Sequence, residues 1–275
     1  MKEKTIKMPE TIHDGRLDLI LAILDLIQSK QSEAKILFDF QKTKVIEASG
    51  YAILCCLSDA LREHQKTSGV FGLQKIKHAE FIRKLLENKP SNTFLPIAKM
   101  KLVTPTFILK GLEQCIDPSF NEDLDQIFMA SLGEEKLWYV RLILNELMQN
   151  AMDHATSERY FLYAGFHESH FQFGVCDMGV SIPAKLEQKY NCMDDFSYLK
   201  KSLEFGVGTR RARPGGLGLN HMFEALKSQK GRLVILSRNA QLRIYFNRRK
   251  TEGGMLKKPL RGTWCMARFL VGRKS

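Results

Sequence analysis

The sequence predicts an α/β protein built from two domains, and three observations lead to that prediction. Its 275 residues exceed the roughly 100 to 200 that a single domain usually holds. Strand-like and helical segments alternate over residues 1–90, and a proline-containing segment without sustained periodicity follows at 91–120. Residues 121–275 open with the strongest helical pattern of the chain and continue with alternating, hairpin-like segments. We therefore expect a domain at 1–90, a connecting segment at 91–120 and a second domain at 121–275.

The first domain consists of alternating strand-like and helical segments. The strand-like runs KTIKMP and AKILFDF stand on either side of RLDLILAILDLIQ, in which Leu and Ile recur at helical spacing. The segment EASGYAILCCLSDALREHQ is helical, with Ser49 as its candidate N-cap, and the strand-like GVFGL and the helical HAEFIRKLLEN come after it. This order predicts a small α/β layer domain.

The second domain begins with a long helix, EEKLWYVRLILNELMQNAMDHA. Two hairpin-like pairs follow, RYFLYAGF with HFQFGVCD and RLVILSR with LRIYFN, and TWCMARFLV is a last strand. The irregular stretch 183–220 between the pairs contains Lys, Arg and Gly and predicts a loop or lid. His167 and His170 fall between two strand-like runs, where a hairpin turn is favoured over a metal site.

Composition indicates a protein of the cytoplasm. The chain is 44% hydrophobic and 26% charged, and its longest apolar runs fall far short of the roughly 20 residues that a membrane span needs. The N-terminal MKEKTIKMPETIHDG has no apolar core followed by a cleavage site, so no secretory leader and no membrane partner are expected. The six cysteines include no C-x-x-C pair, which favours reduced thiols over a disulfide framework.

The net charge of +12 is concentrated in the C-terminal part of the chain. From Lys200 onward there are 19 Lys and Arg residues against 3 Asp and Glu residues. Such a field attracts phosphates of any kind, so it does not choose among nucleotide, nucleic acid and anionic lipid. A nucleic-acid interface would use the basic side chains of this part, namely Arg248, Arg249, Lys250, Lys257 and Lys258.

The long helix of the second domain carries polar side chains next to its apolar stripe. Glu146, Asn150 and Asp153 follow one another at spacings of four and three, and His154 comes next, so all four fall within about a third of the circumference. Carboxylate and amide oxygens suit a hard cation such as Mg²⁺, with water and nucleotide phosphates completing its shell. A solvated polar helix face is the alternative that this helix alone leaves open.

Two later segments favour the ligand-binding interpretation. Asp177 ends an apolar strand just before Gly179 and a turn, where an exposed carboxylate could accept a hydrogen bond from an exocyclic amine. The glycines of RPGGLGL precede a helix-like run, an arrangement that lets backbone N–H groups approach phosphate. The chain has no G-x-x-x-x-G-K-[ST] and no G-x-G-x-x-G after an early strand, so P-loop and Rossmann binding are excluded.

These segments, in this order, resemble the GHKL ATPase superfamily, which includes DNA gyrase, heat-shock chaperones, histidine kinases and anti-sigma-factor serine kinases. The resemblance covers about residues 123–271 and implies a Bergerat-type α/β sandwich with helices on one face of a mixed sheet. NELMQNAMDHA looks like the N box, which implies that Glu146 activates the nucleophile and that Asn150 binds Mg²⁺. DMGVS looks like the D-x-G-x-G box, which implies that Asp177 contacts adenine and that Gly179 lines its pocket.

The remaining family elements also have counterparts. GGLGL looks like the phosphate-binding glycine box at Gly216, Gly218 and Leu219, and RGTW resembles the closing G-T element, with Thr263 near adenine. The second glycine of the D-x-G-x-G box is replaced by Ser181, which puts nucleotide affinity in question unless its dihedral angles are ordinary. FGVGTRRARPGG resembles the lid, and its phosphate neighbours would be Thr209, Arg210 and Arg211.

The first domain resembles STAS domains, the fold of anti-sigma-factor antagonists, over about residues 3–88. The resemblance rests on the strand ILFDF, the turn VIEASG and the helix after Gly50. It implies that Ser49 is a phospho-acceptor, while the role of helix N-cap stays open for the same side chain. Phosphate at a helix N-terminus is favoured by the helix dipole and adds up to about two negative charges.

The sequence thus predicts an enzyme that binds Mg²⁺ and ATP and regulates a pathway. It would hydrolyse ATP or transfer the γ-phosphate to a protein serine, coupled to the STAS-like signalling domain and to a protein partner. One alternative is a nucleotide-gated interaction switch without turnover, and another is nucleic-acid binding through the basic C-terminal part. A homo-oligomer is compatible with each of them.

Overall fold

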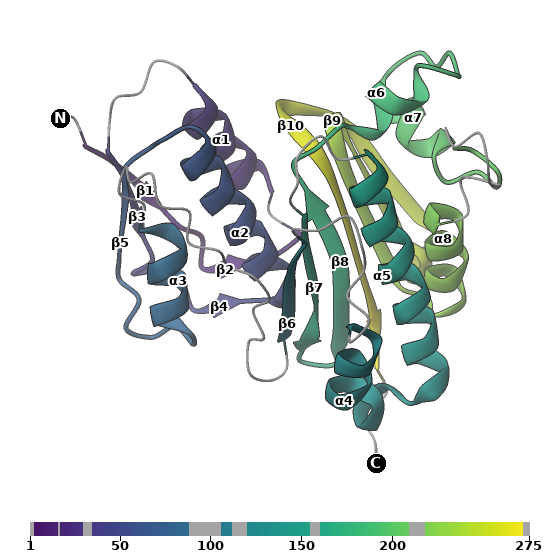
Figure 1. Cartoon of the computed structure of the whole chain (residues 1–275), viewed down its shortest axis with the longest axis horizontal. Helices are drawn as coiled ribbons and strands as arrows, with labels where there is room; N and C mark the ends of the chain where they lie inside the picture. Colours follow the sequence, from purple (N-terminus) through teal and green to yellow (C-terminus); the bar gives the residue numbers. More distant parts are fainter. Residues whose placement is uncertain are drawn as a thin grey trace. The chain divides into compact units, whose positions relative to one another are not determined.

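The computed structural model describes residues 3–15, 17–29, 35–87, 106–111, 120–154, 160–208 and 218–271 (Figure 1). The chain divides into two compact units, Met1–Ile97 and Ala98–Ser275. The described residues form eight α-helices and three β-sheets, which confirms the predicted α/β class. None of the helices in these ranges is both long and apolar enough to cross a bilayer.

The first unit is built on parallel strands. Strands β1, β3 and β5 form one parallel sheet in the order β1-β3-β5, and β2 pairs with β4 in a second one. Helices α1 and α2 supply the long crossovers that parallel strands need. The elements are β1 (Glu3–Lys7), β2 (Thr11–Ile12), α1 (Asp18–Gln28), β3 (Lys35–Asp39), β4 (Val45–Ile46), α2 (Ala48–Glu63), β5 (Ser68–Phe71) and α3 (Ala79–Leu86).

The start of α2 differs from the prediction. The N-cap residue is Glu47, with φ −76° and ψ 170°, and Ser49 lies two residues later, as the second residue of the helix. Ser49 is 1% exposed, and its hydroxyl accepts a hydrogen bond of 3.2 Å from the backbone N–H of Asp14. The prediction of Ser49 as N-cap is therefore wrong, because Glu47 occupies that position and Ser49 already belongs to the helix.

The second unit has one five-stranded sheet in the order β6-β7-β8-β10-β9, with helices packed on it (Figure 1). Its strands are β6 (Thr106–Gly111), β7 (Tyr160–His167), β8 (His170–Asp177), β9 (Arg232–Tyr245) and β10 (Lys250–Leu270). Its helices are α4 (Phe120–Leu132), α5 (Glu134–His154), α6 (Ile182–Leu186), α7 (Asp195–Lys201), α8 (Gly218–Ser228) and the 3₁₀ turn η1 (Phe246–Arg248). Every strand pairing described in this sheet is antiparallel, where a mixed sheet was expected.

Strand β9 folds back on itself. Fourteen extended residues would span about 45 Å. However, the N–H of Phe246, just past its end, donates to the carbonyl of Gly231, just before its start, at 3.0 Å. The reversal falls at Arg238, whose φ is 52°. Because of the reversal, residues 232–237 and 240–245 pair with different parts of β10. This confirms the hairpin predicted for RLVILSR and LRIYFN.

The core of the second unit lies between the sheet and helices α4, α5 and α8, which cover one face (Figure 1). Alternate residues of β8 and β10 supply the sheet side of this core, as the period of two requires. They are Phe171, Phe173, Val175, Cys265, Ala267 and Phe269. By the same alternation, Asp177 and Thr263 extend toward the face that carries the helices.

The stretch 183–220, predicted as a loop, contains α6, α7 and the start of α8 within its described part. Helices α6 and α7 begin at side-chain caps. The Ser181 oxygen accepts from the N–H of Ala184 at 3.2 Å, and Asp194 Oδ1 accepts from the N–H of Ser197 at 2.7 Å. Helices of five and seven residues are too short to show a helical period, so the caps are their main sequence signal. Strand β6, inside the predicted connecting segment, also had no periodic signal.

Helix α7 is attached to the β9 turn by a charge cluster. Both oxygens of Asp195 accept from Arg238 Nε at 2.9 Å, and the backbone N–H of Asn239 donates to Oδ2 at 3.1 Å. Arg238 Nη1 also donates to Glu187 at 2.8 Å. The hydrogen bonds from Arg238 lower the pKa of the Asp195 carboxyl group. The cluster holds the non-glycine residue at positive φ in place.

We expect Asp195→Asn to lower the free energy of unfolding by about 2 kcal/mol, because the change leaves the Arg238 guanidinium without its buried carboxylate. Glu187→Gln removes the exposed partner of the same arginine and should change stability by less than about 1 kcal/mol. Urea unfolding of both variants at neutral pH measures the difference. Equal effects of the two substitutions would contradict the conclusion that the Asp195–Arg238 pair attaches α7 to the β9 turn.

Candidate functional site

The polar face of α5 borders the core of the second unit. Glu146 and Asn150 lie one turn apart and are both half-buried. Leu147 and Met148 between them are buried in the core, which fixes the rotation of the helix. Asp153 is exposed and accepts a hydrogen bond of 2.6 Å from Gln149 Nε2. The helix therefore presents Glu146 and Asn150 as a pair, and Asp153 is occupied by a neighbour on its own helix.

Asp177 is a buried carboxyl group at the end of β8, and not the exposed carboxylate that was expected, because β7 and β10 pair with its strand on either side. The residue is 8% exposed, and its Oδ1 accepts a hydrogen bond of 2.9 Å from the N–H of Gly179. Burial raises the pKa of the Asp177 carboxyl to about 7, although the backbone N–H groups of Gly179 and Thr263 favour the ionised form. A buried acid of this kind marks functional sites more often than ordinary surfaces.

Thr263 is the direct strand partner of Asp177. The two residues face each other in the register of β10 and β8, so their side chains share one face with Cβ atoms about 4.5–5.5 Å apart. Gly262, just before Thr263, has φ +92°, and a Cβ there would lie 2.1 Å from the carbonyl oxygen of Asp177. Glycine is thus needed for β10 to approach the end of β8 this closely.

Ser181 occupies its position without backbone strain. Its φ of −71° and ψ of 154° are ordinary extended values, so no glycine is required there. The side chain is the N-cap of α6, and Pro183 is the second residue of that helix. The replacement of glycine by serine in the D-x-G-x-G pattern therefore supplies a helix cap.

Ser237 is a site neighbour that the sequence did not reveal. It is fully buried on β9, and its Oγ donates to the carbonyl of Gly262 at 2.9 Å. The same oxygen accepts from the N–H of Ile182 at 2.9 Å and lies 2.9 Å from Thr263 Oγ1. The only sequence signal is that Ser237 is a polar residue directly after the apolar run RLVIL. Asp177 likewise follows the apolar run GVC.

The predicted glycine box is described only in part. Gly218 is the first residue of α8, a helix of eleven residues, and Leu219 packs against the core. Asn220 Nδ2 donates to the carbonyl of Leu203 at 2.9 Å, which attaches the start of α8 to the end of the α7 region. Gly216 and the lid candidates Thr209, Arg210 and Arg211 lie outside the described residues, as does the His154 side chain.

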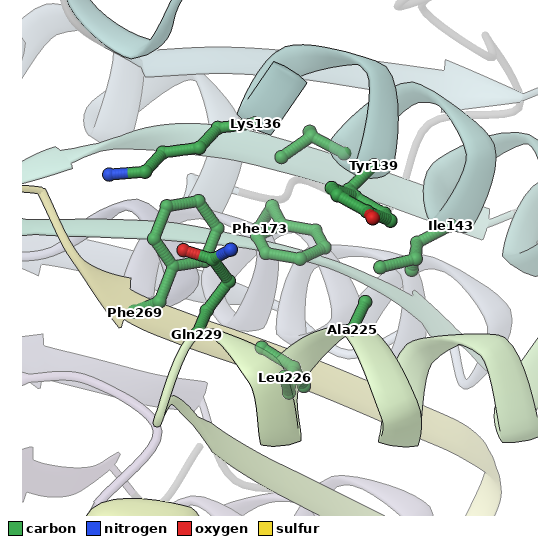
Figure 2. A pocket seen from close by; sticks show the side chains of 9 residues that line it. Lys136, Tyr139, Ile143, Phe173, Ala225, Leu226, Gln229 and Phe269 are labelled. Atoms are coloured by element: carbon green, nitrogen blue, oxygen red, sulfur yellow. The ribbon is translucent and has the colours of Figure 1, made fainter.

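A small, mainly apolar pocket opens between α5 and α8 over strands β8 and β10, and Figure 2 shows the side chains around it. Its lining consists of Lys136, Tyr139, Val140, Ile143, Phe173, Ala225, Leu226, Gln229 and Phe269. None of the predicted site residues lines it. On α5 it lies on the N-terminal half, whereas Glu146 and Asn150 belong to the C-terminal half.

Several charged groups lie outside the Asp177 region. His167 and His170 face each other across the turn between β7 and β8, which confirms the predicted hairpin turn. In the first unit, ligand atoms of His13, Asp14 and Glu47 all lie within 4.8 Å of one another. The five basic side chains named for nucleic-acid binding are exposed around η1 and β10. They are available to solvent and lie outside the Asp177 region in sequence.

Comparisons with models of protein families, with curated proteins and with solved structures find no match for this chain.

We expect the Asp177 carboxyl to make stability depend on pH. The folded chain binds this proton more tightly than the unfolded chain, with a pKa of about 7 against 3.8. The protonated Asp177 carboxyl therefore adds to the free energy of unfolding. This contribution is complete below pH 4 and is lost as pH rises through 7. Relative to Asp177→Asn, wild type should lose about 4 kcal/mol of unfolding free energy between pH 4 and pH 8, as judged by denaturant titration. Asp153→Asn, at an exposed position, serves as the control, and a parallel pH profile for wild type and Asp177→Asn would refute the assignment.

Ser181 offers a second stability test. Ser181→Ala removes the cap of α6 and should lower the free energy of unfolding by about 1 kcal/mol, whereas Ser181→Gly should lower it by only a few tenths, about 0.3 kcal/mol. Thermal unfolding of the two variants distinguishes them. If glycine is worse than alanine, the side chain is not acting as a helix cap.

Proposed function

We propose that the second unit binds Mg²⁺ and ATP as a GHKL-type domain and uses them for ATP hydrolysis or for phosphoryl transfer to a protein serine. The observation that carries the proposal is the buried Asp177 carboxyl. It ends a central strand, bonds to Gly179 and Thr263, and faces the helix layer to which α5 belongs. A buried acid costs stability, and a ligand that bonds to it offsets that loss.

The residues at the end of β8 fit an adenine base. The Asp177 carboxylate would accept from the exocyclic amine, and Gly179 and Thr263 would border the ring. Gly262 supports this fit because its missing Cβ lets β10 close onto the backbone of Asp177. Ser181 is compatible with it as well, since it caps α6 at ordinary dihedral angles.

The phosphates and the metal would be held on the helices. Asn150 offers an amide oxygen of the kind that Mg²⁺ accepts as a ligand. Gly218, with Gly216 before it, would bring N–H groups at the start of α8 to the phosphates, where the helix dipole favours negative charge. Bound Mg²⁺ would neutralise phosphate charge.

Glu146 is the proposed general base. It lies one turn before Asn150 on α5 and is half-buried at the border of the core. Its carboxylate would orient a water molecule or a protein hydroxyl and accept the proton from that oxygen. Asp153 is left out of this role because it is exposed and bonded to Gln149.

The two units support the finer fold assignment to different degrees. The alternation of parallel strands and helices along the first unit is consistent with a STAS-like domain. In the second unit, helices on one face of a sheet are consistent with a Bergerat-type sandwich, although the described pairings are all antiparallel. We propose these assignments together with the activity.

If the protein is a kinase, Ser49 is the proposed acceptor of the phosphoryl group. The neighbours of Ser49 indicate what effect its phosphorylation would have. Ser49 is buried, bonds to the loop at Asp14, and follows Glu47 by two residues. Asp14 and Glu47 are themselves buried acidic residues. A phosphate placed among them would be repelled, so transfer requires this junction to open and would then hold it open.

The test is incubation of the full chain with Mg²⁺ and γ-labelled ATP, following nucleotide binding, free phosphate and protein label. We expect Glu146→Gln to keep binding but to slow phosphate release or transfer by about 10²–10⁴-fold. Asn150→Ala should weaken binding of ATP only when Mg²⁺ is present. Asn145→Ala is the matched control on the same helix, because its amide bonds to Asn121 at 3.2 Å.

The outcomes separate the branches. Label on Ser49 identifies a kinase, and free phosphate alone identifies an ATPase. Binding without either product identifies a nucleotide-gated switch and overturns turnover. Failure of the wild-type chain to bind ATP overturns the proposed function altogether.

A further inference from the structure

We propose that Ser237 is a positioning residue that sets the base specificity of this site by making the Thr263 hydroxyl a hydrogen-bond acceptor. This inference rests on the proposed nucleotide-binding function and deepens it. Ser237 is fully buried and so acts through Thr263, which is 9% exposed.

The protons and lone pairs of the two hydroxyl groups determine which of them donates. A serine hydroxyl has one proton and can accept two hydrogen bonds. Ser237 Oγ has three neighbours at 2.9 Å, the carbonyl of Gly262, the N–H of Ile182 and Thr263 Oγ1. The carbonyl can only accept and the N–H can only donate. All three contacts are hydrogen bonds only if Ser237 donates to Gly262 and accepts from both Ile182 and Thr263.

The hydroxyl proton of Thr263 is therefore used in its hydrogen bond to Ser237. The lone pairs of its oxygen are what remain for a ligand. Any arrangement in which Thr263 kept its proton for a ligand would leave two oxygens in contact at 2.9 Å without a proton between them. In a fully buried position that loss is not compensated by water.

Two acceptors thus stand side by side at the end of β8. Thr263 is the strand partner of Asp177, and the side chains of both residues lie on the same face of the sheet. Above the pKa of Asp177 the carboxylate also only accepts. The pair selects a base edge that offers N–H groups, such as a 6-amino purine. A 6-oxo purine brings a carbonyl oxygen to the same place, where no donor meets it.

Ser237 also fixes the position of Thr263 relative to residues 177–181. Its bond to Ile182 reaches the first residue of α6, immediately after Ser181, and its bond to Gly262 reaches the residue that approaches Asp177. One hydroxyl therefore joins β9, β10 and the start of α6. A substitution there has a structural effect as well as a polarity effect, and the test has to separate the two.

The test compares equilibrium binding of ATP and inosine triphosphate, a 6-oxo analogue, at pH 8 in the presence of Mg²⁺. Wild type should prefer ATP. Ser237→Ala returns the Thr263 proton to the pocket, and we expect the ATP preference to narrow by about tenfold, the equivalent of one hydrogen bond. Ser202→Ala removes another buried hydroxyl of this unit, one that donates to the Leu199 carbonyl at 2.7 Å, and should leave the ratio unchanged.

A second variant keeps the inference testable if Ser237→Ala does not fold. Thr263→Val removes the acceptor oxygen, while Ser237 keeps its bonds to Gly262 and Ile182. This variant should also reduce the ratio of the affinity for ATP to the affinity for inosine triphosphate. Equal loss of affinity for both nucleotides in Ser237→Ala or Thr263→Val overturns the specificity role and leaves the proposed function standing. Absence of binding of either nucleotide to wild type overturns the proposed function itself.

Discussion

The antiparallel pairing of β8 with β10 is the constraint on which the second unit depends. It brings Thr263 opposite Asp177 and continues into the core through Val175 and Cys265. The pairing is close enough that glycine is required at two places. A Cβ at Gly174 would lie 2.2 Å from the carbonyl of Cys265, and one at Gly262 would lie 2.1 Å from that of Asp177. The candidate site is the end of this pairing, where core side chains give way to polar ones.

The polar end of the sheet is maintained against the preference of a buried position for apolar groups. Asp177 keeps a carboxyl where burial disfavours its charge, and Ser237 keeps a hydroxyl where no solvent reaches it. Each is supported by bonds to the backbone, from Gly179 in one case and to Gly262 in the other. A fold built only for stability would have apolar side chains here, so the arrangement favours a ligand-binding role.

Much of the local structure could be predicted, because it depends on residues close together in the sequence. The long helix α5 and the hairpin β7-β8 follow from periodicity and turn position. Ser237 could not be assigned because its partners lie 25, 26 and 55 residues away. Ser49 is not the N-cap because the helix begins one residue earlier, at Ala48, and Asp14, 35 residues away, donates its N–H to the Ser49 hydroxyl. The proposed site roles of Glu146 and Asn150 come from the resemblance to a family pattern and not from their local structure.

The raised pKa of Asp177 has a consequence for the thermodynamics of any ligand that bonds to its ionised form. Near neutral pH a substantial part of the population carries the proton, since the carboxyl pKa is about 7. Binding of such a ligand would expel that proton to the solvent. The observed heat of binding would then include the ionisation heat of the buffer, and occupancy would be linked to the acidity of the surroundings through a single side chain.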